Sequence, residues 1–157
     1  LLIYALVYVF MNLGAFTVAM LVGNEDGYEL EAFDGLATRN LGLALLMTFF
    51  LLSLAGIPPM AGFIGKFALF AAAVKAGHWW LAVAGVLNSV VSVYYYMAIA
   101  FHMFFKTPKT LEPARTDVLI SGTLAFAAVG VLVIGLYPEP FLAAARLSAE
   151  MLPAVHQ

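Results

Sequence analysis

Long apolar runs separated by short polar stretches dominate the chain. The pattern predicts four membrane crossings, over about 1–22, 41–76, 78–105 and 118–137. A helix of about 20 residues crosses the roughly 30 Å hydrocarbon core of a bilayer, because each residue adds about 1.5 Å. The last stretch, 139–152, is amphipathic and is expected to lie at the membrane interface.

The second run, 41–76, departs from this pattern. It is too long for one straight crossing and too short for two crossings with a turn. Near its middle stand Pro58 and Pro59, which break a helix because each lacks an N–H and its ring clashes with the preceding turn. We expect two half-helices broken near 57–59, the second beginning near Met60. The backbone groups freed at such a break must be satisfied, which places the segment inside the helix bundle.

Composition supports this prediction. The chain is 64% hydrophobic and 10% charged, with a mean hydropathy of +1.00, and a soluble domain of 157 residues would leave too much of that apolar surface wet. We therefore expect an all-α, polytopic transmembrane bundle forming a single domain over 1–157. The chain begins within an apolar run at Leu1. We interpret it as the C-terminal part of a longer protein, with sites between helices incomplete and independent folding not expected.

The net charge and the small number of residues that could bind a metal exclude several functions. A net charge of -2 without a basic stripe argues against nucleic acid as a partner. The chain has no cysteine, so it offers no disulfide and no thiolate ligand for a metal or an iron–sulfur cluster, and its three histidines are scattered. We expect no metal site and no cofactor in this chain. Motifs for nucleophilic, phosphate or dinucleotide chemistry are also missing, which leaves movement of an ion.

Lys66 is the strongest candidate for that chemistry. A lysine at the bilayer centre costs about 2.5–3.5 kcal/mol on insertion scales, so it is rarely placed there without a function. Its ammonium would have to reach the interface if it merely snorkelled, and Gly77 lies roughly 15 Å further along a helix. We favour a buried lysine that exchanges a proton. Lys75, beside Trp79 at a helix end, fits snorkelling instead.

Two helices carry polar stripes. Tyr4, Tyr8 and Asn12 share one side of the first crossing. They either bond to neighbouring helices and the interface or line water.

On the third crossing, Asn88, Ser92, Tyr95 and His102 fall within a narrow sector of a 3.6-residue helix. We predict that the first three line water. His102 is either a possible proton relay or a wet histidine near the helix end.

The connectors set the orientation. The stretch 24–40 holds five acids without the spacing of a calcium loop, so it is interpreted as a solvated connector. Four crossings place 24–40 and 106–117 on one side, where most of the arginines and lysines fall. The positive-inside rule puts that side in the cytoplasm or matrix.

Several motifs together point to a family. Residues 53–67 read SLAGIPPMAGFIGKF, Asn88-Ser89 and the tyrosines at 94–96 follow, and 8–16 read YVFMNLGAF. Together they resemble the antiporter-like membrane subunits of respiratory complex I, most closely subunit N, the counterpart of mitochondrial subunit 2. The chain is similar to the last four helices of such a subunit.

The resemblance implies a role for Lys66 on a discontinuous helix, as a proton relay in the outward half of a channel driven by quinone reduction elsewhere. It implies other membrane-arm subunits of complex I, the lipid bilayer and protons as partners. NADH, FMN, iron–sulfur clusters and quinone would belong to the whole complex. The location would be the bacterial inner membrane or its mitochondrial equivalent. A subunit of a multisubunit sodium/proton antiporter and a structural membrane subunit remain alternatives.

Overall fold

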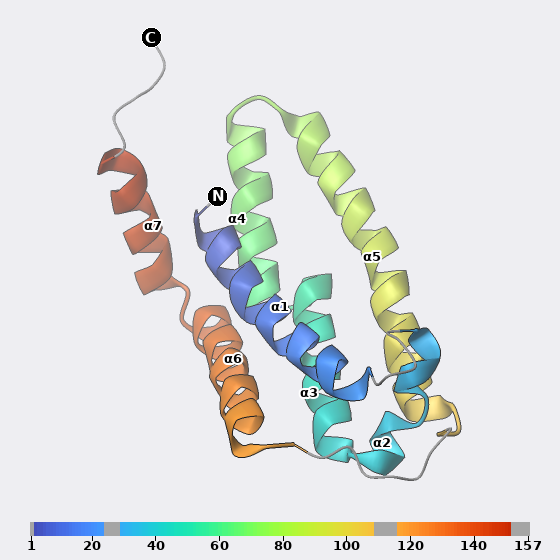
Figure 1. Cartoon of the computed structure of the whole chain (residues 1–157). Coiled ribbons are helices and arrows are strands. Elements are labelled where there is room, and N and C mark those ends of the chain that lie inside the picture. Colours follow the sequence, from blue (N-terminus) through green and yellow to red (C-terminus); the bar gives the residue numbers. More distant parts are fainter. Residues whose placement is uncertain (1, 24–28, 109–115, 152–157) are drawn as a thin grey trace.

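The computed structural model describes residues 2–23, 29–108 and 116–151, and the regular elements in these ranges are all helices (Figure 1). No strand occurs in those ranges, which confirms the predicted all-α class. The elements are α1 Leu2–Val22, η1 Leu30–Phe33, α2 Leu36–Arg39, α3 Leu41–Ala55, α4 Ala61–Lys75, α5 Trp79–Phe105, α6 Val118–Leu136 and α7 Glu139–Met151.

The long helices alternate in direction. In Figure 1, α1 and α5 run towards one end of the bundle, whereas α3, α4 and α6 run back towards the other. The end of α1, the start of α3, the end of α5 and the start of α6 therefore lie at the same end, as the predicted topology requires. Helix α1 lies at the centre and packs against α6, α3 and α4. Its buried side chains, with those of α3 and α6, form most of the core.

The break in the second run lies where the sequence predicts it. Helix α3 ends at Ala55, and Gly56 adopts a left-handed conformation with φ 86° that suits glycine. The Ile57 N–H then donates to the Leu52 carbonyl at 3.2 Å, the pattern of a Schellman cap. Helix α4 begins at Ala61, one residue after the predicted start, and continues in the same overall direction as α3 (Figure 1). The break is confirmed, and glycine capping ends α3 before the prolines are reached.

Two glycines let the backbone around the break approach closely. A Cβ added to Gly62 would lie 1.7 Å from the Ser53 carbonyl oxygen, so the first turn of α4 rests directly on the last turns of α3. A Cβ added to Gly135 of α6 would lie 2.6 Å from the Pro59 carbonyl oxygen. Small residues at helix contacts are a common means of close packing in membranes. The break is thus held between α3, α4 and α6.

Helix lengths agree with a membrane protein. Within the described residues, α1, α5 and α6 are each long and apolar enough to cross a bilayer, and α3 is a shorter apolar helix of 15 residues. Helix α4 also has 15 residues, so neither half suffices alone. The count of four crossings stays a prediction. Helix α5 packs against the bundle by one side only, with Met103 as its buried residue.

Candidate functional site

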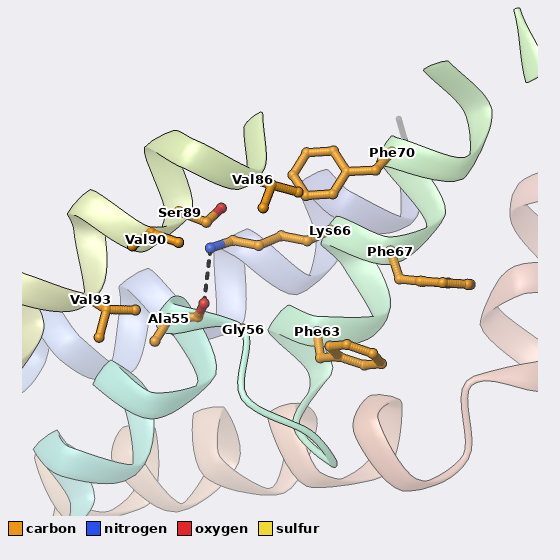
Figure 2. A pocket seen from close by; sticks show the side chains of 10 residues that line it. All are labelled: Ala55, Gly56, Phe63, Lys66, Phe67, Phe70, Val86, Ser89, Val90 and Val93. Carbon is orange, nitrogen blue, oxygen red and sulfur yellow. Dashed lines mark hydrogen bonds between the residues drawn. The ribbon is translucent and has the colours of Figure 1, made fainter. Parts of the chain in front are cut away.

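Lys66 lies in the second turn of α4 and reaches back to the end of α3. Its Nζ donates a hydrogen bond to the Ala55 carbonyl oxygen at 3.2 Å (Figure 2). Ala55 is the last residue of α3, and the final carbonyls of a helix have no partner within it. A cation is also favoured there by the helix dipole. The lysine of one half-helix therefore caps the other.

The side chain of Lys66 lies in a cavity of ≈ 370 Å³ between the break, α4 and α5. Among the described residues that line this cavity, Lys66 and Ser89 carry the polar side chains, and none is acidic. Figure 2 shows the lysine extending from α4 towards α5, with aromatic rings on its own helix and valines opposite. The lining comprises Ala55, Gly56, Phe63, Lys66, Phe67, Phe70, Val86, Ser89, Val90 and Val93.

The face of α5 that borders this cavity is not the face that carries the polar stripe. Ser89 borders the cavity, whereas Asn88 is exposed and Tyr95 is 62% exposed. Ser92 donates to the Asn88 carbonyl of its own helix at 2.9 Å. The stripe Asn88, Ser92 and Tyr95 is therefore not brought to Lys66, and its water-lining role stays a prediction. Gly85, against which Phe70 packs, lies one helical turn before Ser89, and small residues at this spacing are typical of a helix face that packs closely on a neighbour.

His102 is joined to the connector between α1 and α3. Its Nδ1 lies 2.6 Å from Asp34 Oδ1, and the two side chains are 17% and 14% exposed. The Gly35 N–H also donates to the His102 carbonyl at 3.0 Å. These contacts fix the connector to the end of α5, away from Lys66. A relay role for His102 stays a prediction.

The polar side chains of α1 have different partners. Tyr4 packs over Gly65 of α4, where an added Cβ would lie 3.4 Å from its ring, and it stacks on Tyr8 with centroids 5.5 Å apart. Asn12 donates to the Tyr8 carbonyl of its own helix at 2.7 Å rather than across to another helix. Their water-lining role stays a prediction.

Ser53 is a buried polar residue to which sequence reasoning gave no role. It is 0% exposed. Its hydroxyl donates to Met11 Sδ at 3.0 Å and accepts from the Gly62 N–H at 3.3 Å. Nothing in the sequence pattern sets this serine apart from one that bonds to its own helix, because the contact joins three helices.

Other residues have simpler positions. Lys75 ends α4 and is exposed, which fits snorkelling. Pro58 and Pro59 lie within the break itself. Among the described residues, no group of three histidines and acids is placed to hold a metal ion.

Fold and site together define a class: a helical membrane protein in which one apolar segment is broken into two half-helices beside a half-buried lysine. Residues 1–92 match the transmembrane family described as NADH:quinone oxidoreductase/Mrp antiporter. This match covers more than half of the chain, and the chain belongs to that family.

Similar proteins include NADH-quinone oxidoreductase subunit N 2 of Rhizobium meliloti, 47% identical over 150 residues, which are 94% of this chain and 31% of that protein. Subunit N of Trichlorobacter lovleyi is 43% identical over 154 residues, 96% of this chain and 32% of the relative. A solved structure of respiratory complex I from Thermus thermophilus with bound aureothin contains a chain that is 33% identical, with a TM-score of 0.76. That match covers 87% of this chain and 32% of the other. The chain thus spans about a third of the length of these relatives.

Proposed function

We propose that this chain belongs to a proton-translocating, subunit N-like component of an NADH:quinone oxidoreductase membrane arm, in which Lys66 loads and releases a proton. The observation that carries the proposal is the Lys66 ammonium, held on the end of a broken helix in an apolar cavity. Membership in the family supports it, as does similarity to subunit N and to a chain of respiratory complex I.

The contacts of Lys66 suit a group that changes charge. Its ammonium donates a hydrogen bond to the neutral Ala55 carbonyl, and the described lining of the cavity holds no carboxylate to lock the ammonium in an ion pair. Loss of the proton would therefore not leave an opposite charge unpaired in a poor dielectric. Ionisable groups inside membranes commonly mark such ion paths.

The remaining machinery would lie outside this chain. NADH, FMN, iron–sulfur clusters and quinone would belong to the whole complex, and quinone reduction there would drive the change at Lys66. The other membrane-arm subunits of complex I and the lipid bilayer would surround the chain. The location would be the inner membrane of a bacterium.

The test replaces Lys66 by alanine in the full-length protein within the assembled complex. We expect proton translocation to fall, because the replacement removes the group that exchanges the proton. Proton uptake or release by membrane vesicles is measured alongside NADH oxidation. Lys75→Ala is the matched control, since Lys75 lies on the same helix at its exposed end. Unchanged rate and stoichiometry in Lys66→Ala would refute the proposal.

A second candidate is a subunit of a multisubunit sodium/proton antiporter, because the matching family description also names Mrp antiporters. The two functions differ in their driving reaction. An antiporter would exchange sodium for protons without quinone reduction, and no quinone reductase would purify with it. Sodium-dependent proton movement in vesicles without NADH would favour this candidate.

A further inference from the structure

The two half-helices at the break satisfy each other's free ends. Lys66 of α4 donates to Ala55, the last residue of α3. In return, Ser53 of α3 accepts the N–H of Gly62, the second residue of α4. The first N–H groups of a helix have no partner within it, and an unsatisfied one in a membrane is costly. The break is therefore closed by one bond in each direction.

The two bonds differ in whether they can be switched. A serine hydroxyl keeps its hydrogen-bonding capacity at any physiological pH, whereas a lysine that releases its proton changes what it can donate. Ser53 is also anchored to a third helix, because its hydroxyl donates a hydrogen bond to Met11 Sδ on α1 at 3.0 Å. It is 0% exposed, so water does not replace either contact.

We infer that Ser53 is a positioning residue for Lys66: it holds the first turn of α4 on α3, so that the ammonium returns to the Ala55 carbonyl. The contact geometry leaves little freedom, because Gly62 already lies against the backbone of Ser53. Lys66 follows Gly62 by one helical turn, and a shift of this turn moves the ammonium away from its carbonyl. The inference rests on the proposed function for its effect on proton transfer.

The test is Ser53→Ala in the full-length protein within the assembled complex, with two readouts. Hydrogen exchange of the amides in the first turn of α4 should rise about threefold to tenfold, as expected for loss of one neutral hydrogen bond. Protons translocated per NADH oxidised should fall, while NADH oxidation itself continues. Thr48→Ala is the matched control, because Thr48 lies on the same helix but donates to Ala44 of that helix.

Lys66→Ala is measured in parallel, so that failure of the positioning role of Ser53 can be distinguished from failure of the proposed function of Lys66. Unchanged exchange in Ser53→Ala overturns the inference. Suppose that Lys66→Ala lowers the number of protons translocated per NADH oxidised. The inference is then also overturned if Ser53→Ala raises hydrogen exchange but leaves this number unchanged. If Lys66→Ala leaves the ratio unchanged, the proposed function fails, and raised exchange still supports Ser53 as the tie between the half-helices.

Met11→Leu keeps the inference testable if Ser53→Ala does not assemble. Leucine preserves the bulk of methionine but removes the sulfur acceptor, while Ser53 keeps its bond to Gly62. We expect the same changes at smaller amplitude. The anchoring role of Met11 would be overturned if an assembled Met11→Leu complex kept wild-type hydrogen exchange in α4 and a wild-type number of protons translocated per NADH oxidised.

Discussion

Asp34 and His102 form a contact that joins the connector before α3 to the end of α5. A histidine near a helix end has two ordinary uses in a membrane protein, as a proton relay or as a wet interfacial group. Here its ring lies 2.6 Å from a carboxylate on a connector more than sixty positions earlier, and its carbonyl accepts from Gly35. The observed contacts therefore suit a tie between α5 and the connector.

We predict that Asp34→Ala and His102→Ala each loosen the connector around η1 and α2. Hydrogen exchange of peptides from 29–40 should rise in either variant, and the double variant should add little, because both remove the same contact. Glu31→Ala, an exposed acid on η1, serves as the control. Additive increases in hydrogen exchange in the double variant would contradict a shared contact between Asp34 and His102. A fall in proton translocation in His102→Ala but not in Asp34→Ala would favour the relay.

At the scale of elements, the break between α3 and α4 depends on more than its prolines. Gly56 caps α3 in a left-handed conformation, and Gly62 allows the start of α4 to rest on α3. Pro58 and Pro59 cannot continue a helix, so they keep the two halves apart. The break therefore depends on three features: the glycine cap at the end of α3, the close approach at Gly62, and the two prolines.

Gly62→Ala should damage the break severely. The added methyl would lie 1.7 Å from the Ser53 carbonyl oxygen, which no side-chain adjustment relieves because the obstacle is backbone. We expect less assembled complex, measured by native electrophoresis. Gly122→Ala on α6 is the control, since a Cβ there meets nothing within 4 Å. Wild-type assembly in Gly62→Ala would show that α4 can shift freely.

Replacing Pro58 and Pro59 together with alanine should favour a continuous helix and impair proton translocation. The expected cause is loss of the geometry that brings Lys66 to the end of α3. Proton translocation and NADH oxidation are measured as for Lys66→Ala. Normal activity in the double variant would mean that Gly56 and Gly62 suffice to maintain the break.

At the scale of the whole molecule, α5 indicates that the chain needs further partners. Its outer face exposes Asn88, Tyr94 and Tyr95, and Tyr94 is 74% exposed. An amide at membrane depth requires a protein or water partner. The relatives are about three times as long as this chain, so the remainder of such a protein has room to cover this face. We still expect that the chain does not fold stably alone.

The predicted topology is testable because the chain has no cysteine of its own. Glu29→Cys and Thr107→Cys should react with a membrane-impermeant maleimide from the cytoplasmic side, and His78→Cys from the opposite side. Each is made in a full-length background lacking other cysteines, and labelling is compared between inside-out and right-side-out vesicles. Reaction of Glu29→Cys and Thr107→Cys from opposite sides would contradict the alternation of the helices in Figure 1.

Hydrophobic runs and the Pro58-Pro59 pair were sufficient to predict the helical class and the broken helix, and the isolated Lys66 suggested the candidate site. These features follow from local rules, because membrane length, missing N–H groups and the cost of a buried charge depend on sequence alone. Tertiary structure decided which residues meet: Lys66 with Ala55, His102 with Asp34, and Ser53 with Met11 and Gly62. It also placed Ser89 in the lining of the same cavity as Lys66. Helix rotation sets these contacts, and a shift of one residue turns a helix by about 100°. Packing of α5 against α4 therefore placed Ser89, and not Asn88, at the cavity.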